Sequence, residues 1–214
     1  MTDRTTVTYL FDPLCGWCYG AGPGLDMLSA APAFSLELAP TGLFAGAGAR
    51  PMDDGFAAYA WANDQRIEKL TGQRFTVAYR DRVLADRQRR LDSGPATLAL
   101  TAVHLTAPDG ERDALKAIQQ ARYVDGRDVT DAAVLAALLD DAGFRAAAGR
   151  LARPDGDLAA AMQARIDAAR RQMQGFGVAG VPALILGEGD RRRLLPAAAL
   201  FQDLSTLLTT LTAA

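Results

Sequence analysis

The sequence predicts an α/β protein in which a large all-helical segment interrupts a single β-sheet domain. Three observations support this prediction: strand patterns occur only near the two ends of the chain, the middle shows only helical spacing, and residues 5–39 fit a β-α-β unit. Half of the 214 residues are hydrophobic and 22% are charged. We therefore expect a globular protein with a sizeable core.

The N-terminal part of the chain predicts a strand, a helix and a second strand. Residues 5–11 are rich in β-branched and aromatic side chains, and their nearly continuous apolar end is typical of a central strand covered on both faces. From Cys15 onward apolar positions recur every three or four residues, which predicts a helix ending near Ala31–Pro32, with Pro23 as a kink or an early break. Residues 34–39 alternate with period two and predict the second strand, reached by a right-handed crossover.

The middle of the chain shows only helical patterns. Apolar residues recur at helical spacing in residues 56–70, 94–105, 115–118, 134–142 and 158–173. Thr130 or Asp131 can cap the fourth of these helices and Gly143 can end it, while the last is expected to reach Gly175. No strand pattern interrupts this stretch, so it is predicted to be entirely helical.

Strand patterns return near the C-terminus. Pro182–Leu186 and the more polar Arg191–Leu195 flank the turn sequence at residues 187–190, which predicts a hairpin. A final helix is expected from Pro196 to Thr212, with leucines on its buried face.

The order of these elements predicts where the insertion begins and ends. We expect residues 1–45 and 157–214 to form the two halves of the sheet domain and residues 46–156 to form the helical insertion. The glycine-rich segment 42–48 lacks the Lys-Ser/Thr ending of a phosphate-binding loop and is interpreted as a hinge.

Charge and hydropathy exclude several classes of partner. Lysine and arginine total 23 and acidic residues total 25, so the net charge of −2 gives no field that would attract nucleic acid or an anionic membrane. No apolar run approaches the roughly 18 residues of a membrane-spanning helix. The segment Met1–Leu14 lacks the long apolar region of a signal peptide. We therefore expect a cytoplasmic protein without nucleic-acid or membrane partners.

The two cysteines of the chain form one motif, Cys15-Gly16-Trp17-Cys18. Because it lies where a strand passes into a helix, the Cys15 sulfur should lie near the first free N–H groups, whose dipoles stabilise a thiolate. The thiolate is the nucleophile, and one turn of helix brings Cys18 close enough to resolve a mixed disulfide. Gly16 permits close approach of backbone or substrate, and Trp17 adds bulk. We predict Cys15 and Cys18 as the catalytic pair.

Other uses of a cysteine pair fit less well. A zinc site lacks ligands, since there is no second cysteine pair and His104 is the only histidine. Haem attachment requires a histidine directly after the second cysteine, where Tyr19 stands. Two inert core cysteines remain an alternative. The prediction includes no metal and no cofactor other than the redox-active Cys15–Cys18 disulfide.

Three segments carry a resemblance to a known family. Asp12-Pro-Leu-Cys-Gly-Trp-Cys-Tyr-Gly20 resembles the active-site segment of the DsbA-type thioredoxin-fold thiol-disulfide oxidoreductases, in particular a cytosolic, bacterial branch of FrnE-like proteins. Arg122–Val129 resembles a segment of that branch's helical insertion, and Gly177–Ala183 resembles its cis-proline loop. The resemblance implies a thioredoxin fold with a large all-helical insertion between its βαβ and ββα halves.

The same resemblance implies roles for residues outside the cysteine motif. Val181–Pro182 would be a cis peptide beside Cys15, with Pro182 shaping the site and the Val181 backbone offering strand-like hydrogen bonds to an extended substrate. Family members often carry a buried acid six residues before the nucleophile, where this chain has Tyr9. Proton transfer from Cys18 would then use water, a backbone group, or a carboxylate such as Asp12 or Asp26.

The predicted activity is therefore that of a thiol-disulfide oxidoreductase acting on a thiol-containing or disulfide-containing protein or small molecule. The chain lacks the histidine found between the cysteines of strongly oxidising members, which favours a disulfide reductase or isomerase. One alternative is a glutathione-dependent enzyme like the kappa-class transferases or 2-hydroxychromene-2-carboxylate isomerases, although these use a serine at the nucleophile position. Another is a peptide-binding chaperone in which the cysteines are incidental.

Two weaker features complete the set of candidates. The aromatic residues Trp17, Phe44, Tyr59, Trp61 and Tyr123 could line a groove between the domains or belong to the core. His104 lies in an apolar helical segment without a visible partner and is assigned no role.

Overall fold

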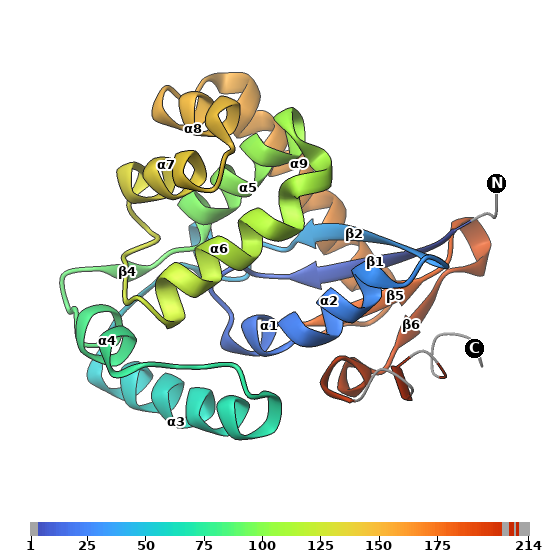
Figure 1. Ribbon diagram of the computed structural model, residues 1–214, viewed down its shortest axis with the longest axis horizontal. Helices are drawn as coiled ribbons and strands as arrows, with labels where there is room; N and C mark the ends of the chain where they lie inside the picture. The colour runs from blue at the N-terminus through green and yellow to red at the C-terminus, as the bar shows by residue number, and fades with distance from the viewer. Residues whose placement is uncertain (1–3, 203–205, 208, 210–214) are drawn as a thin grey trace.

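The computed structural model describes residues 4–202, 206, 207 and 209, and its centre is a four-stranded sheet (Figure 1). The strands are β1 (Thr5–Phe11), β2 (Phe34–Pro40), β5 (Ala183–Leu186) and β6 (Arg193–Leu195), in the order β2-β1-β5-β6. β1 runs parallel to β2 and antiparallel to β5, and β5 pairs with β6 as the predicted hairpin. β1 is therefore a central strand.

Both faces of β1 are covered, which explains its nearly continuous apolar run. Val7, Tyr9 and Phe11 point into one core with residues of α1 and α2, while Leu10 packs on the other face with Ala169 of α9. In Figure 1 the helices α1 and α2 lie in front of the sheet and α9 passes behind it.

The helix after β1 is divided close to Pro23, where the sequence predicted a kink or an early break. It forms α1 (Gly16–Gly20) and α2 (Gly22–Ala30), which meet at Ala21. Pro23 lies in the first turn of α2 and has no N–H to give to the carbonyl of Tyr19. The Gln73 side chain donates to that carbonyl instead, at 3.1 Å. The break is thus set by a proline and satisfied by a residue from a distant segment.

The middle of the chain is helical, as predicted, apart from one very short ladder. Its helices are α3 (Asp54–Thr71), α4 (Val77–Tyr79), α5 (Gly94–Thr106), α6 (Glu111–Tyr123), α7 (Ala132–Asp141), α8 (Arg145–Ala152) and α9 (Gly156–Gly175). Asp131 caps α7 by accepting hydrogen bonds from two backbone N–H groups, and Gly143 follows with a φ of 88°. The two-residue strands β3 (Arg50–Pro51) and β4 (Arg90–Leu91) pair antiparallel, which corrects the expectation that no strand occurs here. Two residues are too few to leave a pattern in the sequence.

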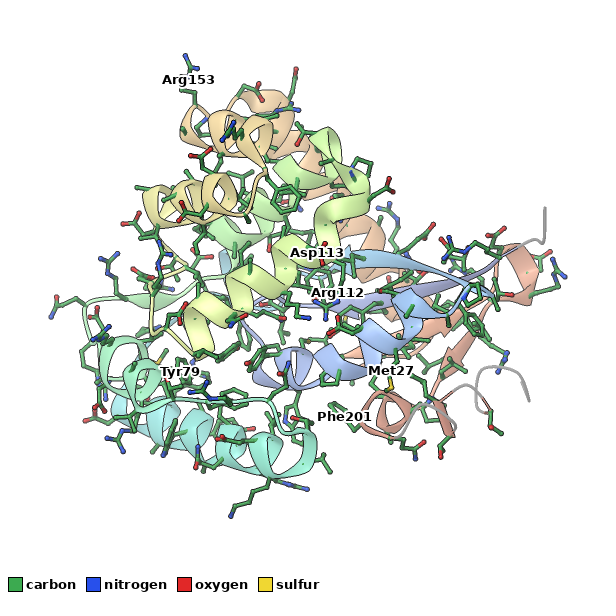
Figure 2. All side chains as sticks on the ribbon, in the orientation of Figure 1. Met27, Tyr79, Arg112, Asp113, Arg153 and Phe201 are labelled. Atoms are coloured by element: carbon green, nitrogen blue, oxygen red, sulfur yellow. The ribbon has the colours of Figure 1, made fainter. Side chains whose placement is uncertain are left out.

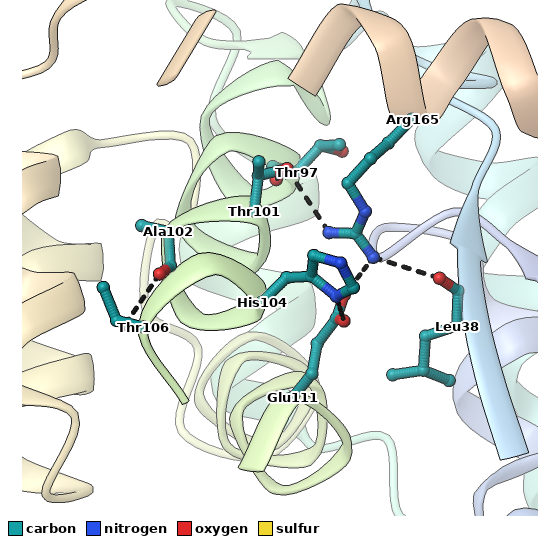
Figure 3. Close-up of polar contacts among 8 residues, drawn as sticks. All are labelled: Leu38, Thr97, Thr101, Ala102, His104, Thr106, Glu111 and Arg165. Carbon is teal, nitrogen blue, oxygen red and sulfur yellow. Dashed lines mark hydrogen bonds and ion pairs between the residues drawn. The ribbon is translucent and has the colours of Figure 1, made fainter. Parts of the chain in front are cut away.

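Arg165 of α9 ties the helices to the sheet (Figure 3). Its guanidinium donates to the carbonyl of Leu38 in β2, to the carboxylate of Glu111 in α6 and to the hydroxyl of Thr101 in α5. His104 completes the cluster, with Nδ1 2.8 Å from the same Glu111 carboxylate. His104 therefore has a hydrogen-bonding partner that its sequence context did not reveal.

The C-terminal helix differs from the prediction at its start. A 3-10 helix, η5 (Ala197–Phe201), follows Pro196, and Gln202 then adopts extended backbone. The expected continuous helix from Pro196 is therefore wrong at Gln202. Thr206, Leu207 and Thr209 are helical, and the remaining positions up to Thr212 lie outside the described residues.

No helix in the described part of the chain is both long and apolar enough to cross a bilayer. The domain boundaries after residues 45 and 156 stay a prediction; the second falls at the first residue of α9.

Candidate active site

Cys15 and Cys18 occupy the start of α1. Cys15 is the N-cap residue, with extended backbone, and Cys18 follows within the single helical turn. Both are free thiols. The exposed fraction is 8% for Cys15 and 1% for Cys18, so the first cysteine borders the surface and the second lies behind it. This order matches a nucleophile that meets the substrate and a partner that resolves the product.

The Val181–Pro182 bond is cis, as the family resemblance implied. The Cys15 sulfur lies 3.8 Å from the carbonyl oxygen of Val181. These residues are far apart in sequence, but Pro182 leads directly into β5, which pairs with β1 on the strand side of the cysteine motif. The sheet therefore brings the predicted proline loop to the nucleophile.

The buried cysteine is held by polar groups from β1 and from the turn after it. The Tyr9 hydroxyl donates to the carbonyl of Cys18 at 3.1 Å, and the backbone N–H of Asp12 donates to the Cys18 sulfur. Burial raises the pKa of the Cys18 thiol well above its usual range, and the adjacent Cys15 sulfur raises it further. These effects favour the protonated form of the Cys18 thiol.

Of the two carboxylates considered for proton transfer, only Asp12 lies at the site. It is fully buried, and it accepts hydrogen bonds from the backbone N–H groups of Leu14 and Phe44 and from the Ser93 hydroxyl. Burial raises its pKa, while the Ser93 hydrogen bond opposes that rise. Asp26 instead forms ion pairs with Arg112 and Lys116 near the surface.

A cavity of about 150 Å³ opens beside Cys15 between α1, α3 and α6. Four of the five aromatic residues proposed for a groove line it, namely Trp17, Phe44, Tyr59 and Tyr123. Trp61 does not; its ring instead faces the guanidinium of Arg80 at 5.6 Å. Aromatic side chains thus form part of the cavity wall, together with Cys15.

The cavity also holds two charged residues that sequence reasoning missed, Asp64 and Arg122. The hydroxyl of Tyr79, labelled in Figure 2, donates to Asp64 Oδ2 at 3.1 Å. Burial raises the pKa of Asp64 to about 7. The guanidinium carbon of Arg122 lies 5.5 Å from the ring centre of Tyr79 and 5.6 Å from that of Tyr123.

The sequence did contain a signal for Asp64. It follows Ala60 by four residues and precedes Ile67 by three, so it interrupts the apolar face of α3 with an acid. Arg122 is the first residue of the segment that resembled the family's insertion, but it carried no assigned role.

Gly16 makes room for this carboxylate. A Cβ atom at position 16 would lie 2.3 Å from Asp64 Oδ1. The close approach predicted for Gly16 therefore includes the insertion helix α3 and not only backbone or substrate. On the other side of the motif, the Tyr123 hydroxyl donates to the carbonyl of Leu14 at 2.8 Å. The insertion thus contacts the residues immediately before and after Cys15.

Among the residues that the structure describes, no group of three or more His, Cys, Asp or Glu side chains is placed to hold a metal ion.

Comparisons with known proteins agree with this geometry. The family model described as "DSBA-like thioredoxin domain" matches residues 6–208. A solved structure of the cytosolic disulfide reductase DsbM from Pseudomonas aeruginosa is 32% identical, with a TM-score of 0.84, covering 98% of this chain and 100% of that chain. A second structure of that protein, with GSH, is 30% identical, with a TM-score of 0.80 and coverage of 98% and 100%.

A third solved structure, from Nitrosomonas europaea and described as a candidate protein disulfide isomerase, is 24% identical. Its TM-score is 0.81, with coverage of 99% of this chain and 97% of that chain, and it supports the fold alone. The comparison with curated proteins finds no match.

The predicted fold class is confirmed: a thioredoxin fold carries a helical insertion between the halves of its sheet. The family model matches nearly the whole chain, and the cysteine pair lies at the start of α1. The chain belongs to the DSBA-like thioredoxin domain family and is a DsbA-like thiol-disulfide oxidoreductase.

Proposed function

We propose that the chain is a disulfide reductase that exchanges thiols with protein or small-molecule disulfides through Cys15 and Cys18. One observation carries the proposal: a single helical turn holds the more accessible Cys15 at the edge of a cavity and buries Cys18 directly behind it. This arrangement lets one sulfur meet a substrate while the other is kept for the second step.

The proposed reaction has two exchanges. The Cys15 thiolate attacks one sulfur of the substrate disulfide, a mixed disulfide forms, and the other substrate sulfur leaves as a thiolate that takes up a proton. Cys18 then loses its proton and attacks the Cys15 sulfur, which releases the second substrate thiolate and leaves a Cys15–Cys18 disulfide. Two electrons pass from the dithiol to the substrate, and an external thiol restores the dithiol.

The residues around the pair have positioning tasks in this proposal. Gly16 and Trp17 shape the surface next to Cys15, and Pro182 holds the Val181 carbonyl beside the sulfur. The backbone of Val181 is suited to hydrogen-bond an extended substrate in the manner of an added strand.

Glutathione is the small thiol that we propose as a partner. The Pseudomonas aeruginosa relative is a cytosolic disulfide reductase and was solved with this tripeptide, which supports a glutathione-containing disulfide as substrate or glutathione as reductant. The same relative supports the cytoplasm as the location of this chain.

The direct test is the reduction of insulin by dithiothreitol, with the rate measured as the increase in turbidity. The wild type should accelerate the reaction and the Cys15→Ser variant should not. Equal rates for the two proteins would remove the proposal. Equilibration of the Cys15–Cys18 pair with a glutathione redox buffer then gives its reduction potential. A potential near that of the cytosolic glutathione pool would favour a reductase over an oxidase.

The glutathione-dependent transferase alternative shares the small thiol but does not need Cys18. Calorimetry that finds tight glutathione binding, together with conjugation activity that survives Cys18→Ser, would favour that alternative. Suppression of insulin aggregation that persists unchanged in the double serine variant would instead favour a chaperone.

A further inference from the structure

The carboxyl group of Asp64 lies in the cavity beside Cys15, and the reaction described above gives it no task. It comes from α3, in the insertion, and it lines the same cavity as the Cys15 sulfur. Its Oδ1 faces Gly16, the residue next to the nucleophile, and its Oδ2 accepts the Tyr79 hydroxyl. The Asp64 carboxyl group and the Cys15 sulfur therefore share one cavity, with the carboxyl against the residue that follows the nucleophile.

Burial of Asp64 favours its protonated form, and two neighbouring groups partly oppose this effect. A buried carboxylate is costly unless it is paired, and no cation of the described residues lies within 4.0 Å of it. The titratable and charged groups that line the cavity with it are Cys15 at the N-cap of α1, Tyr59 of α3, Tyr79 of α4, and Arg122 and Tyr123 of α6.

Two of these neighbours stabilise the charged form and so oppose the effect of burial. They are the Tyr79 hydroxyl, through its hydrogen bond, and Arg122, through its charge. Arg80 and Asp81, at the start of the π-helix η2 (Arg80–Leu84) that follows α4, pair with each other at the surface. The pKa of about 7 that results lies where a proton can be given and regained at neutral pH.

We propose that Asp64 is the proton donor for the leaving thiolate in the first exchange, an inference that rests on the proposed function. Cys15 forms its bond to one substrate sulfur as the substrate S–S bond breaks. The departing thiolate receives the Asp64 proton and leaves as a thiol. Asp64 remains as a carboxylate and takes a new proton from water before the next turnover.

The other buried acid of the site is unsuited to this task. Both oxygens of Asp12 are engaged, Oδ1 by the Leu14 N–H and Oδ2 by the Phe44 N–H and the Ser93 hydroxyl. Asp12 is also not among the residues that line the cavity. Asp64 has one oxygen bound by Tyr79 and presents the other toward the start of α1.

Two disulfides of different leaving group test the proposal in single-turnover experiments with the reduced protein. Hydroxyethyl disulfide releases an alkyl thiolate whose thiol has a pKa above the roughly 8.5 of free cysteine, so this thiolate takes up a proton at neutral pH. An aromatic nitrobenzoate disulfide releases a thiolate that is stable without a proton at neutral pH. Asp64→Asn should slow the alkyl reaction by about 100-fold and leave the aromatic reaction within about threefold of the wild type.

The dependence on pH gives a second readout. In the wild type, the ratio of the alkyl rate to the aromatic rate should fall as pH rises through about 7, because Asp64 loses the proton it donates. In Asp64→Asn the ratio should not change with pH. The matched control is Glu68→Gln, one turn further along α3, where the carboxylate accepts from Gln65 and lies outside the cavity. This control should keep both rates and the pH profile.

A second variant covers the case in which Asp64→Asn does not fold. Tyr79→Phe keeps the ring and removes the hydrogen bond that lowers the pKa of Asp64, so the fall in the rate ratio should move to higher pH. An unmoved profile in this variant, or an equal slowing of both disulfides in Asp64→Asn, would overturn the inference. A wild type that reacts with neither disulfide would overturn the proposed function itself.

Discussion

The carboxylate of Asp64 packs against Gly16, so that a Cβ atom at position 16 would lie 2.3 Å from Oδ1. This contact joins helix α3 to helix α1 at Gly16, the residue directly after Cys15. The helical insertion therefore does more than cover the sheet, because its helix α3 limits which side chain can follow Cys15.

The contact predicts that Gly16→Ala destabilises the protein through a clash with Asp64. We expect a loss of about 1–2 kcal/mol in the free energy of unfolding, as for other small-to-large changes in packed sites. Denaturant unfolding measures it. The cost should shrink in an Asp64→Ala background, and an unchanged cost there would contradict the contact. Gly149→Ala, in α8 where an added Cβ meets nothing within 4 Å, should instead stabilise the protein slightly.

Asp64→Asn should stabilise the protein at alkaline pH. The pKa of Asp64 is raised from 3.8 to about 7, so the folded state binds a proton that the unfolded chain has released between these values. The stability that this proton gives the wild type is fully present below pH 3.8 and is lost as pH rises through about 7.

Asparagine stays neutral throughout that pH range. The advantage of the variant should therefore grow between pH 4 and pH 8, by up to about 4 kcal/mol in the free energy of unfolding. Unfolding in denaturant at the two pH values checks this prediction. A difference between variant and wild type that is constant with pH would show that Asp64 titrates normally.

Ser93→Ala should destabilise the fold because it removes one of the three hydrogen bonds that the buried Asp12 carboxyl accepts. The Ser93 hydroxyl donates to Asp12 Oδ2 at 2.7 Å, and its removal should cost about 1–3 kcal/mol at neutral pH. Because burial already raises the pKa of Asp12, the cost should fall as the solution becomes acidic and the carboxyl gains a proton. Thermal unfolding across pH measures the effect, and Ser29→Ala on the exposed side of α2 is the control.

Cys18→Ser should trap a mixed disulfide at Cys15 when the protein meets glutathione disulfide. The substituted protein can complete the first exchange but has no thiol for the second. Mass spectrometry of the intact chain should find one added glutathione, removed by dithiothreitol. Cys15→Ser should react far more slowly, since Cys18 has an exposed fraction of only 1%. Equal labelling of the two variants would contradict the assignment of nucleophile and resolving cysteine.

Local patterns were sufficient for the parts of the fold that depend on neighbouring residues. The alternation in β2, the apolar end of β1 and the proline at the start of α5 each reflect a local physical requirement, and each element formed where expected. The position of Cys15 as an N-cap follows in the same way, because the strand ends four residues earlier, at Phe11.

The features that sequence reasoning missed depend on contacts between distant segments. The break at Ala21 relies on Gln73, which satisfies the carbonyl that Pro23 leaves without a donor. Asp64 becomes a buried acid only when α3 packs against α1 and Tyr79 covers it, so its own neighbours in sequence gave a weak signal. His104 lacked a visible partner because Glu111 reaches it from the following helix.

The central ladder of the sheet has a consequence for how the chain is made. β1 pairs with β5, whose Leu186 lies about 180 residues beyond its partner Val7, so this pairing has a very high sequence separation. During synthesis, β1 can pair with β2 early but must wait for almost the entire chain before its second edge is covered. Until β5 has been made, the nascent β-α-β unit therefore exposes the unpaired edge of an apolar strand. Binding of a chaperone to the nascent chain during this time would protect that edge from aggregation.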